Sequence, residues 1–193
     1  MVRTILYILY FIVPWILTPL ALLPFHILKL VRSGKAALKY LKFITGAFSR
    51  HLLWMAGGRV SVSGRENITE RRDICFISNH QSYVDIPLIV GYVPVLSGFV
   101  AKKELYKVPI LNLWLSALGC IKLDRGNARS AITAVQEGVR RIKAGYPLVM
   151  FPEGTRSKSG CMKAFKSGSL KLATRAKAII VPMTISGTYR LFE

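Results

Sequence analysis

At 193 residues the chain can hold one substantial core, and its 28 basic against 9 acidic side chains give a formal net charge of +19. A nucleic-acid-binding protein is often this basic, but rarely also 52% hydrophobic, so the composition argues against that class. Anionic lipid headgroups attract basic charge and hydrocarbon takes up apolar side chains, so a protein at a membrane surface can combine both properties.

The first predicted element is an uncharged apolar stretch over residues 4–28, which contains no Asp, Glu, Lys or Arg. A helix of about 20 apolar residues can cross a bilayer, so the length allows a transmembrane span. Pro14, Pro19 and Pro24 each remove a backbone donor and favour a kink or a break. We therefore expect membrane insertion, either as a straight or bent span or as a re-entrant segment in one leaflet.

Basic residues follow this stretch with no acidic residue among them: Lys29, Arg32, Lys35, Lys39, Lys42 and Arg50. The positive-inside rule places this flank, and the chain after it, on the cytoplasmic side. Lys35, Lys39 and Lys42 share one helical face, and an apolar stripe lies on another, formed by Leu38, Leu41, Phe48, Leu52 and Met55. This pattern predicts a basic amphipathic helix that lies on a membrane, packs on the protein's own core with a solvated cationic face, or does both.

After Gly57-Gly58 the chain alternates between strand-like and helix-like segments. We expect strands over residues 60–63, 74–78, 98–101, 120–123, 148–151 and 179–185. We expect helices over residues 85–92, 109–117, 129–144 and 168–176. The alternation indicates an α/β fold with a mixed, mostly parallel sheet covered by helices. The predicted domains are an N-terminal helical membrane-binding element, residues 1–56, and an α/β domain, residues 57–193.

The three cysteines are Cys75, Cys120 and Cys161, an odd number with no CxxC spacing. Such a set indicates neither a disulfide framework nor a zinc site. We expect three small, buried, apolar residues in a reducing compartment.

Histidine is the first choice for a general base near neutral pH, and the chain has three. His26 and His51 have no acidic residue within ten positions. His80 follows the strand expected over residues 74–78, at the kind of strand end where α/β proteins place their sites, and Asp85 comes five positions later. His80 is therefore the candidate base.

In a continuous helix, His80 and Asp85 would point away from each other. If the chain turns at Gln81-Ser82 and a helix begins just after, Asp85 can fold back onto the imidazole and fix its tautomer, leaving the other ring nitrogen to accept a proton. The spacing Ser82-x-x-Asp85 also matches a capping box, in which the carboxylate only stabilises the helix start. The spacing alone leaves both interpretations open.

A second candidate lies at the end of the strand expected over residues 148–151, where a turn carries Glu153, Gly154, Thr155 and Arg156. Arginine can bind phosphate bidentately, and glycine lets the backbone approach a ligand closely. The alternative is a solvated basic loop. No GxSxG elbow, P-loop or dinucleotide fingerprint is found, so the residues favour direct attack by a substrate hydroxyl over a covalent mechanism or a nucleotide cofactor.

Four short blocks occur in a fixed order over residues 79–183. Asn79-His80, followed after four residues by Asp85, resembles the HX4D box of the glycerolipid acyltransferases. Residues 101–105 with Pro109 and residues 119–125 resemble the second family block, FPEGTRS at residues 151–157 the third, and IVPM at residues 180–183 the fourth. Together the blocks make the chain similar to the 1-acylglycerol-3-phosphate (lysophosphatidic acid) acyltransferase branch.

The resemblance implies that His80 is the general base and that Asp85 orients it. It also implies an α/β sheet with an N-terminal helical membrane element, and neither a metal nor a bound cofactor. The residues that it implies at the acceptor's phosphate are Lys102, Arg125, Glu153, Gly154, Thr155 and Arg156.

The implied reaction transfers a fatty acyl group from an acyl-CoA or acyl carrier protein thioester to the free hydroxyl of 1-acylglycerol 3-phosphate. It would make phosphatidic acid for phospholipid biosynthesis at the cytoplasmic face of the cell membrane. Two alternatives stay open: a sibling enzyme acting on glycerol 3-phosphate or another lysolipid, and a non-enzymatic cationic membrane adaptor that does not need His80. No nucleic acid is expected as a partner.

Two features depart from the family pattern. Lys122 stands where the family usually has an apolar residue. Family members commonly continue beyond the fourth block, which leaves open that the domain over residues 57–193 is incomplete at its C-terminal end.

Overall fold

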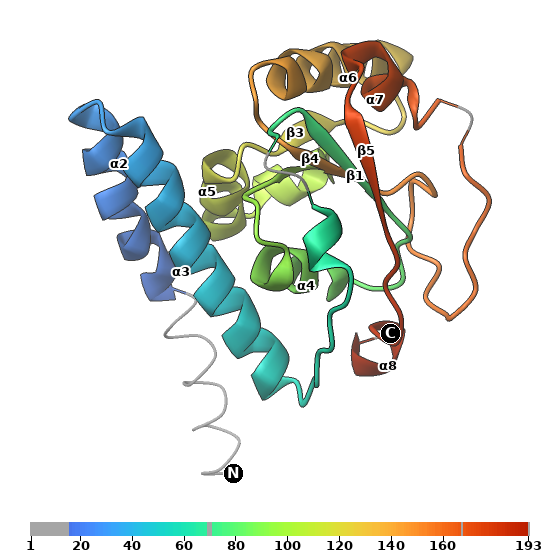
Figure 1. Cartoon of the computed structure of the whole chain (residues 1–193), viewed down its shortest axis with the longest axis horizontal. Helices are drawn as coiled ribbons and strands as arrows, with labels where there is room; N and C mark the ends of the chain where they lie inside the picture. The colour runs from blue at the N-terminus through green and yellow to red at the C-terminus, as the bar shows by residue number, and fades with distance from the viewer. Residues whose placement is uncertain (1–15, 69–70, 167, 193) are drawn as a thin grey trace.

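The computed structural model describes residues 16–68, 71–166 and 168–192 (Figure 1). At its centre a five-stranded sheet has the order β3-β2-β4-β1-β5. The strands are β1 (Ile74–Ser78), β2 (Gly98–Lys102), β3 (Ile121–Leu123), β4 (Leu148–Met150) and β5 (Ile179–Met183). All four pairings are parallel, so the expected α/β fold is found, but the sheet of the described chain is parallel throughout rather than mixed.

Two pairs of helices cover the sheet. On one face lie α4 (Asp85–Tyr92) and α5 (Pro109–Ala117), which pack on Phe76 and Phe99. On the other lie α6 (Ala128–Lys143) and α7 (Lys171–Ala176), which pack on Cys75 and Leu148. Apolar side chains therefore cover both faces, which explains why the strands read as nearly continuous apolar runs.

The N-terminal helices form a further layer outside α4 and α5 (Figure 1). They are η1 (Thr18–Leu22), α2 (Leu23–Leu30) and α3 (Gly34–Met55), and Pro19 and Pro24 stand in the first turns of η1 and α2. This segmentation agrees with the break that prolines predict. The buried side of α3 has a helical period and consists of Ala37, Leu41, Thr45, Gly46, Ser49 and Leu53.

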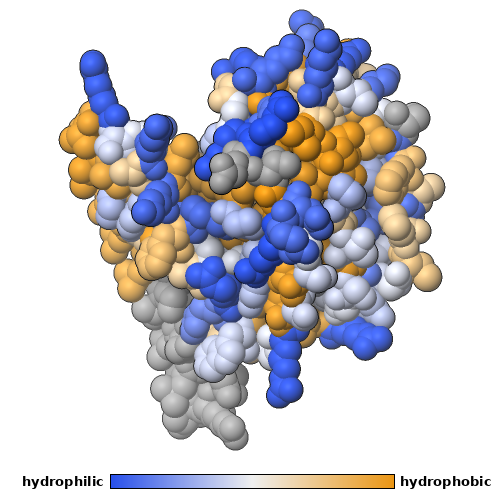
Figure 2. All heavy atoms as spheres, in the orientation of Figure 1, coloured by the Kyte–Doolittle hydropathy of each residue, from blue (hydrophilic) through white to orange (hydrophobic). Residues whose placement is uncertain are grey.

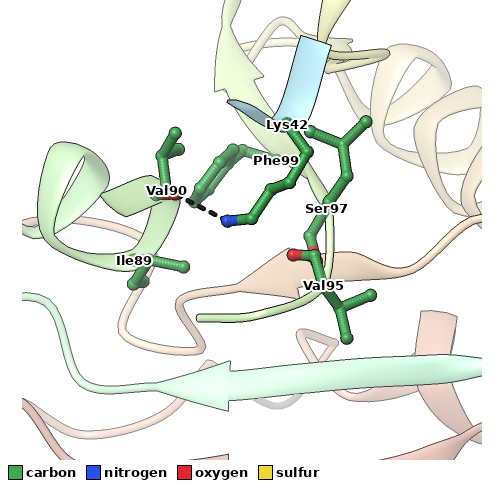
Figure 3. Close-up of a pocket in the computed structure, with 7 residues that line it drawn as sticks. Lys42, Ile89, Val90, Val95, Ser97 and Phe99 are labelled. Atoms are coloured by element: carbon green, nitrogen blue, oxygen red, sulfur yellow. Dashed lines mark hydrogen bonds between the residues drawn. The ribbon is translucent and has the colours of Figure 1, made fainter. Parts of the chain in front are cut away.

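Packing of α3 on the protein's own core, one of the two arrangements expected for this helix, is thus present, but of the predicted apolar stripe only Leu41 is fully buried and Leu38 is exposed. Lys42 departs from the prediction of a solvated cationic face, because its Nζ donates to the carbonyls of Val90 at 2.8 Å and Val93 at 2.5 Å. Figure 3 shows this side chain reaching into a small pocket beside Phe99. The ammonium binds the free carbonyls at the C-terminal end of α4, which a helical-wheel pattern does not reveal.

No helix in the described ranges combines the length and the apolar character that a bilayer crossing requires. The predicted insertion over residues 4–28 falls partly outside these ranges, since residues 4–15 are not described, and it stays a prediction. In the described part, five side chains at helical spacing are more than half exposed: Ile16, Leu20, Leu23, Ile27 and Leu30. In Figure 2 apolar side chains gather over α2, next to basic ones.

Three local predictions were wrong. Residues 60–63 alternate like a strand, but they form no strand in the described chain and are mostly exposed. The helix expected over residues 168–176, which is α7, begins at Lys171 rather than at residue 168. Cys75 and Cys120 are buried as expected, but Cys161 is exposed because it lies in the long loop after β4. The remaining short helices are η2 (Arg65–Asn67), η3 (Lys103–Lys107) and α8 (Tyr189–Phe192).

Candidate active site

The parallel sheet brings the carboxyl ends of all five strands to one edge, which is where open α/β sheets bind ligands. His80 follows β1 by two residues, Glu153 follows β4 by three, and Thr188 follows β5 by five. Since β4 and β5 flank β1 in the sheet, these three segments meet around His80.

His80 and Asp85 form a direct pair. The Nδ1 atom of His80 lies 2.7 Å from Oδ2 of Asp85, and the carboxylate is fully buried while 13% of the imidazole side chain is exposed. A carboxylate only accepts, so Nδ1 carries the proton and Nε2 is the nitrogen that can take another. The chain turns between His80 and α4 as expected, but the turn is formed by Tyr83 and Val84 rather than by Gln81-Ser82, and α4 begins at Asp85.

Asp85 is held by three further donors. Its Oδ2 accepts from the backbone N–H groups of Gln81 at 2.7 Å and Ser82 at 3.0 Å, and its Oδ1 accepts from the hydroxyl of Thr188 at 2.5 Å. The bond from Ser82 N–H is the one that a capping box makes. The other half of a capping box is absent, because the N-cap of α4 is Val84 and the Ser82 hydroxyl accepts from Val84 N–H rather than from Asp85 N–H. The carboxylate thus fixes the turn and the imidazole together.

The imidazole is also held from its face. Its ring stacks on Phe151, with 4.1 Å between centroids and 18° between planes. The preceding residue, Asn79, exchanges two hydrogen bonds with the backbone of Ile185, at 2.8 Å and 2.7 Å. The base is thus fixed by a carboxylate on one edge, an aromatic ring on one face, and a backbone tied to the segment after β5.

Glu153 fastens the loop after β4 to the same place. Its carboxylate is 2% exposed and accepts from the backbone N–H of His80 at 2.7 Å and that of Lys163 at 2.8 Å. The loop is bonded to the turn twice more, through Ser157 N–H to the His80 carbonyl at 2.7 Å and Lys158 N–H to the Gln81 carbonyl at 3.1 Å. Glu153 therefore shapes the site by binding the backbone of two separate segments, at His80 and at Lys163.

Gly154 and Arg156 follow in this loop. Gly154 has φ of +67°, a left-handed conformation that favours glycine, and a Cβ atom there would lie 2.9 Å from Cε of Lys166, so that this flexible side chain would have to move. The guanidinium carbon of Arg156 lies 3.4 Å from the centroid of the Tyr83 ring. Thr155, between them, is exposed. The predicted phosphate-binding turn is thus next to the His80–Asp85 pair.

Lys102 and Arg125 lie on the same edge but farther out. Lys102 ends β2, two strand positions or about 10 Å from β1, and its Nζ lies 3.5 Å from Glu104. Arg125 is exposed in the turn after β3, three strand positions or about 14 Å away. Their role at the phosphate stays a prediction.

Sequence reasoning missed Thr188, Tyr83 and Lys163 as parts of this site. Thr188 is 103 positions from Asp85 and belongs to none of the four blocks, so nothing in the sequence links the two. Tyr83 lies inside the HX4D segment, but its partner is 73 positions away. Lys163 takes part through its backbone N–H, which carries no residue-type signal.

In the described ranges, no group of three or more His, Cys, Asp or Glu side chains is placed to hold a metal ion. The expectation that neither a metal nor a bound cofactor takes part stays a prediction. The geometry itself supplies a histidine with one nitrogen fixed as a donor, next to a turn that carries a positive charge. Such a site can remove a proton from a hydroxyl on an anionic substrate.

A family model described as Acyltransferase matches residues 59–186. The crystal structure of the 1-acyl-sn-glycerophosphate acyltransferase PlsC from Thermotoga maritima is similar, with a TM-score of 0.76 and 33% sequence identity over 97% of this chain and 76% of that one.

Curated relatives named 1-acyl-sn-glycerol-3-phosphate acyltransferase are also similar. That of Borreliella burgdorferi is 34% identical over 72% of this chain and 56% of its own length. That of Saccharomyces cerevisiae is 36% identical over 78% of this chain and 50% of its own length. The chain thus spans about half the length of the curated relatives it matches.

Proposed function

The chain belongs to the acyltransferase family, and from that membership we propose that it transfers a fatty acyl group from an acyl thioester to 1-acylglycerol 3-phosphate. The product would be phosphatidic acid, and the donor would be acyl-CoA or an acyl carrier protein thioester. The names of the similar proteins support the acceptor. The observation that carries the proposal is the 2.7 Å contact between His80 Nδ1 and Asp85 Oδ2.

In the proposed reaction Nε2 of His80 takes the proton of the acceptor hydroxyl as the hydroxyl oxygen attacks the thioester carbonyl carbon. The tetrahedral intermediate collapses, the carbon–sulfur bond breaks, and the leaving thiolate takes the proton from His80. Asp85 keeps Nδ1 protonated and stabilises the imidazolium that forms in between. A positioned base contributes about 10²–10⁴ in rate, and proximity supplies much of the rest.

The acceptor's phosphate would bind to Arg156, with Lys102 and Arg125 adding positive charge from the ends of β2 and β3. Arg156 comes from the loop that Glu153 and two backbone bonds tie to His80. Its distance from the base is therefore restricted by the fold. A phosphate held at Arg156 would set which hydroxyl of the acceptor reaches Nε2.

We place the protein at the cytoplasmic face of the cell membrane, where its lipid substrate is found. The exposed apolar stripe from Ile16, just before η1, to Leu30, at the end of α2, supports this placement. So do the basic residues that follow it, Lys29, Arg32, Lys35 and Lys39, because anionic headgroups attract them. The stripe would enter the headgroup region while the basic residues bind the surface.

A thioester-release assay on purified protein tests the proposal. It would offer 1-acylglycerol 3-phosphate, glycerol 3-phosphate and a lysolipid without a phosphomonoester to the protein, each with acyl-CoA and with acyl carrier protein thioester. Thiol release that depends on 1-acylglycerol 3-phosphate, with phosphatidic acid formed in equal amount, is the expected result. Release with only another acceptor would assign a sibling reaction. Lipid binding without release from any donor would contradict an enzymatic role.

A further inference from the structure

We propose that Tyr83 positions the acceptor's phosphate by holding the guanidinium of Arg156 against its ring. The inference deepens the proposed function and rests on it, because it assumes that Arg156 binds a phosphorylated acceptor. Tyr83 would act through Arg156 and would not touch the reacting atoms. It would therefore be a positioning residue.

The turn that serves the base also fixes Tyr83. Asp85 draws the backbone N–H groups of Gln81 and Ser82 inward, and the hydroxyl of Ser82 accepts from Val84 N–H at 3.3 Å. Tyr83, in the middle of this turn, is 55% exposed. Its ring therefore adds little to the core, and the contact that it does make is with the guanidinium of Arg156.

The Tyr83–Arg156 contact is close. The guanidinium carbon lies 3.4 Å from the ring centroid, which is stacking distance, whereas the exposed Arg190–Tyr189 pair is separated by 5.6 Å. A guanidinium is planar and weakly hydrated, so it stacks on an aromatic face and keeps its N–H groups pointing outward in the ring plane. The stack therefore fixes the plane of the fork, and a phosphate would bind at its edge.

The two residues come from segments that are joined on both sides of the stack. Ser157 N–H donates to the His80 carbonyl at 2.7 Å, and Lys158 N–H donates to the Gln81 carbonyl at 3.1 Å. Lys163 Nζ donates to the carbonyl of Arg156 at 2.9 Å. The backbone of Arg156 is thus fixed relative to the base, and the Tyr83 ring adds a restraint on its long side chain.

The consequence is preorganisation of the phosphate site. Without the ring, Arg156 would still be charged and near the site, but it would sample more rotamers and bind the phosphate with a larger loss of entropy. The cost would appear in acceptor affinity and not in the chemical step. A cation–π contact of this exposure corresponds to about a 2- to 5-fold change in affinity.

Two substitutions of the exposed Tyr83 test the inference in the full chain. Tyr83→Phe keeps the ring and removes the hydroxyl, and Tyr83→Leu keeps bulk and apolarity but removes the aromatic face. We expect Tyr83→Leu to raise the KM for 1-acylglycerol 3-phosphate about 2- to 5-fold, with kcat and the KM for the thioester unchanged. Tyr83→Phe should stay close to the unmodified protein. In an Arg156→Ala background, Tyr83→Leu should have no further effect.

A phenylalanine variant as impaired as the leucine variant would overturn the inference, as would an equal effect of Tyr83→Leu in the Arg156→Ala background.

A binding measurement separates failure of the inference from failure of the proposed function. Calorimetric titration of His80→Ala protein with 1-acylglycerol 3-phosphate needs no turnover, and Tyr83→Leu should weaken its Kd by the same factor. Absent turnover with Tyr83-dependent binding would reject the proposed reaction and keep the inference. Turnover and binding that both ignore Tyr83→Leu would reject the inference alone.

Discussion

The carboxylate of Asp85 accepts from Nδ1 of His80 at 2.7 Å while the same oxygen accepts from two backbone N–H groups of the turn. Asp85→Asn should therefore damage catalysis and stability together. Asparagine has one acceptor oxygen instead of two and no charge, so its NH₂ group faces either the imidazole or the Thr188 hydroxyl, and the imidazolium loses the carboxylate that stabilises it. We expect kcat to fall on the order of 10²–10⁴ and the free energy of unfolding to fall by about 1–3 kcal/mol. Thiol-release kinetics and urea unfolding measure the two effects, and a kcat within a few-fold of the unmodified value would contradict this role.

The hydroxyl of Thr188 donates to the other oxygen of Asp85, at 2.5 Å. Thr188→Val removes the donor and keeps the shape, so the buried carboxylate loses one of its bonds. Hydrogen bonds to charged groups contribute about 1.5–3 kcal/mol, and we expect a loss of stability in that range with a smaller loss of kcat than in Asp85→Asn. Thr188→Ser is the matched control, because it keeps the hydroxyl. Equal stability of the valine and serine variants in urea unfolding would show that the bond does not hold Asp85.

Glu153 accepts from backbone N–H groups on both sides of the loop, those of His80 and Lys163. In Glu153→Gln one of these groups would face an NH₂ donor, so one end of the loop should detach, at a cost of about 1–3 kcal/mol. Limited trypsin digestion should then cut faster after Lys158 and Lys163. Glu137→Gln is the control, because Glu137 lies on α6, where it pairs with Arg140 and Arg141. Identical cleavage rates in both variants would count against the anchoring role.

Lys42 should make stability depend on pH. Burial, helped by the nearby charge of Arg50, lowers its pKa from the ordinary 10.5 to about 8. Between these values the unfolded chain binds more protons at Lys42 than the folded chain, so its contribution to the free energy of unfolding rises with pH from 8 to 10.5. Because the side chain is partly solvated, we expect a rise of only about 1 kcal/mol.

Lys42→Met isolates this effect, because the other titrating groups stay in place. The free energy of unfolding of the unmodified protein, minus that of Lys42→Met, should increase over this window and be flat below it. A difference that stays constant from pH 7 to pH 11 would show that the Lys42 ammonium is not desolvated.

Local pattern was enough to predict much of the fold. The residue ranges expected for β1, α4 and α5 agree with the structure, because each is a compact apolar segment bounded by turn residues or proline. Pairing is a long-range property, and nothing local distinguishes the parallel order β3-β2-β4-β1-β5 from a mixed sheet. Residues 60–63 show the limit of pattern alone, since alternation makes no strand where a partner strand is lacking in the described chain.

The site residues also differ in whether the sequence alone could predict them. His80 and Asp85 are close in sequence, so a turn between them could be predicted and their contact inferred. The part played by Thr188 could not be predicted, because Thr188 reaches Asp85 only through the pairing of β5 with β1 in the folded sheet. Lys42 was misplaced because its partners are carbonyls at the end of α4, and a carbonyl has no residue-type signature.

The central claim is that His80 is the base for acyl transfer, and His80→Ala tests it most directly. The variant would be compared with the unmodified protein for thiol release from acyl-CoA in the presence of 1-acylglycerol 3-phosphate. Sedimentation on anionic vesicles would be the control for membrane binding. We predict that release falls by about 10²-fold or more while sedimentation is unchanged. Release at the unmodified rate would contradict the account.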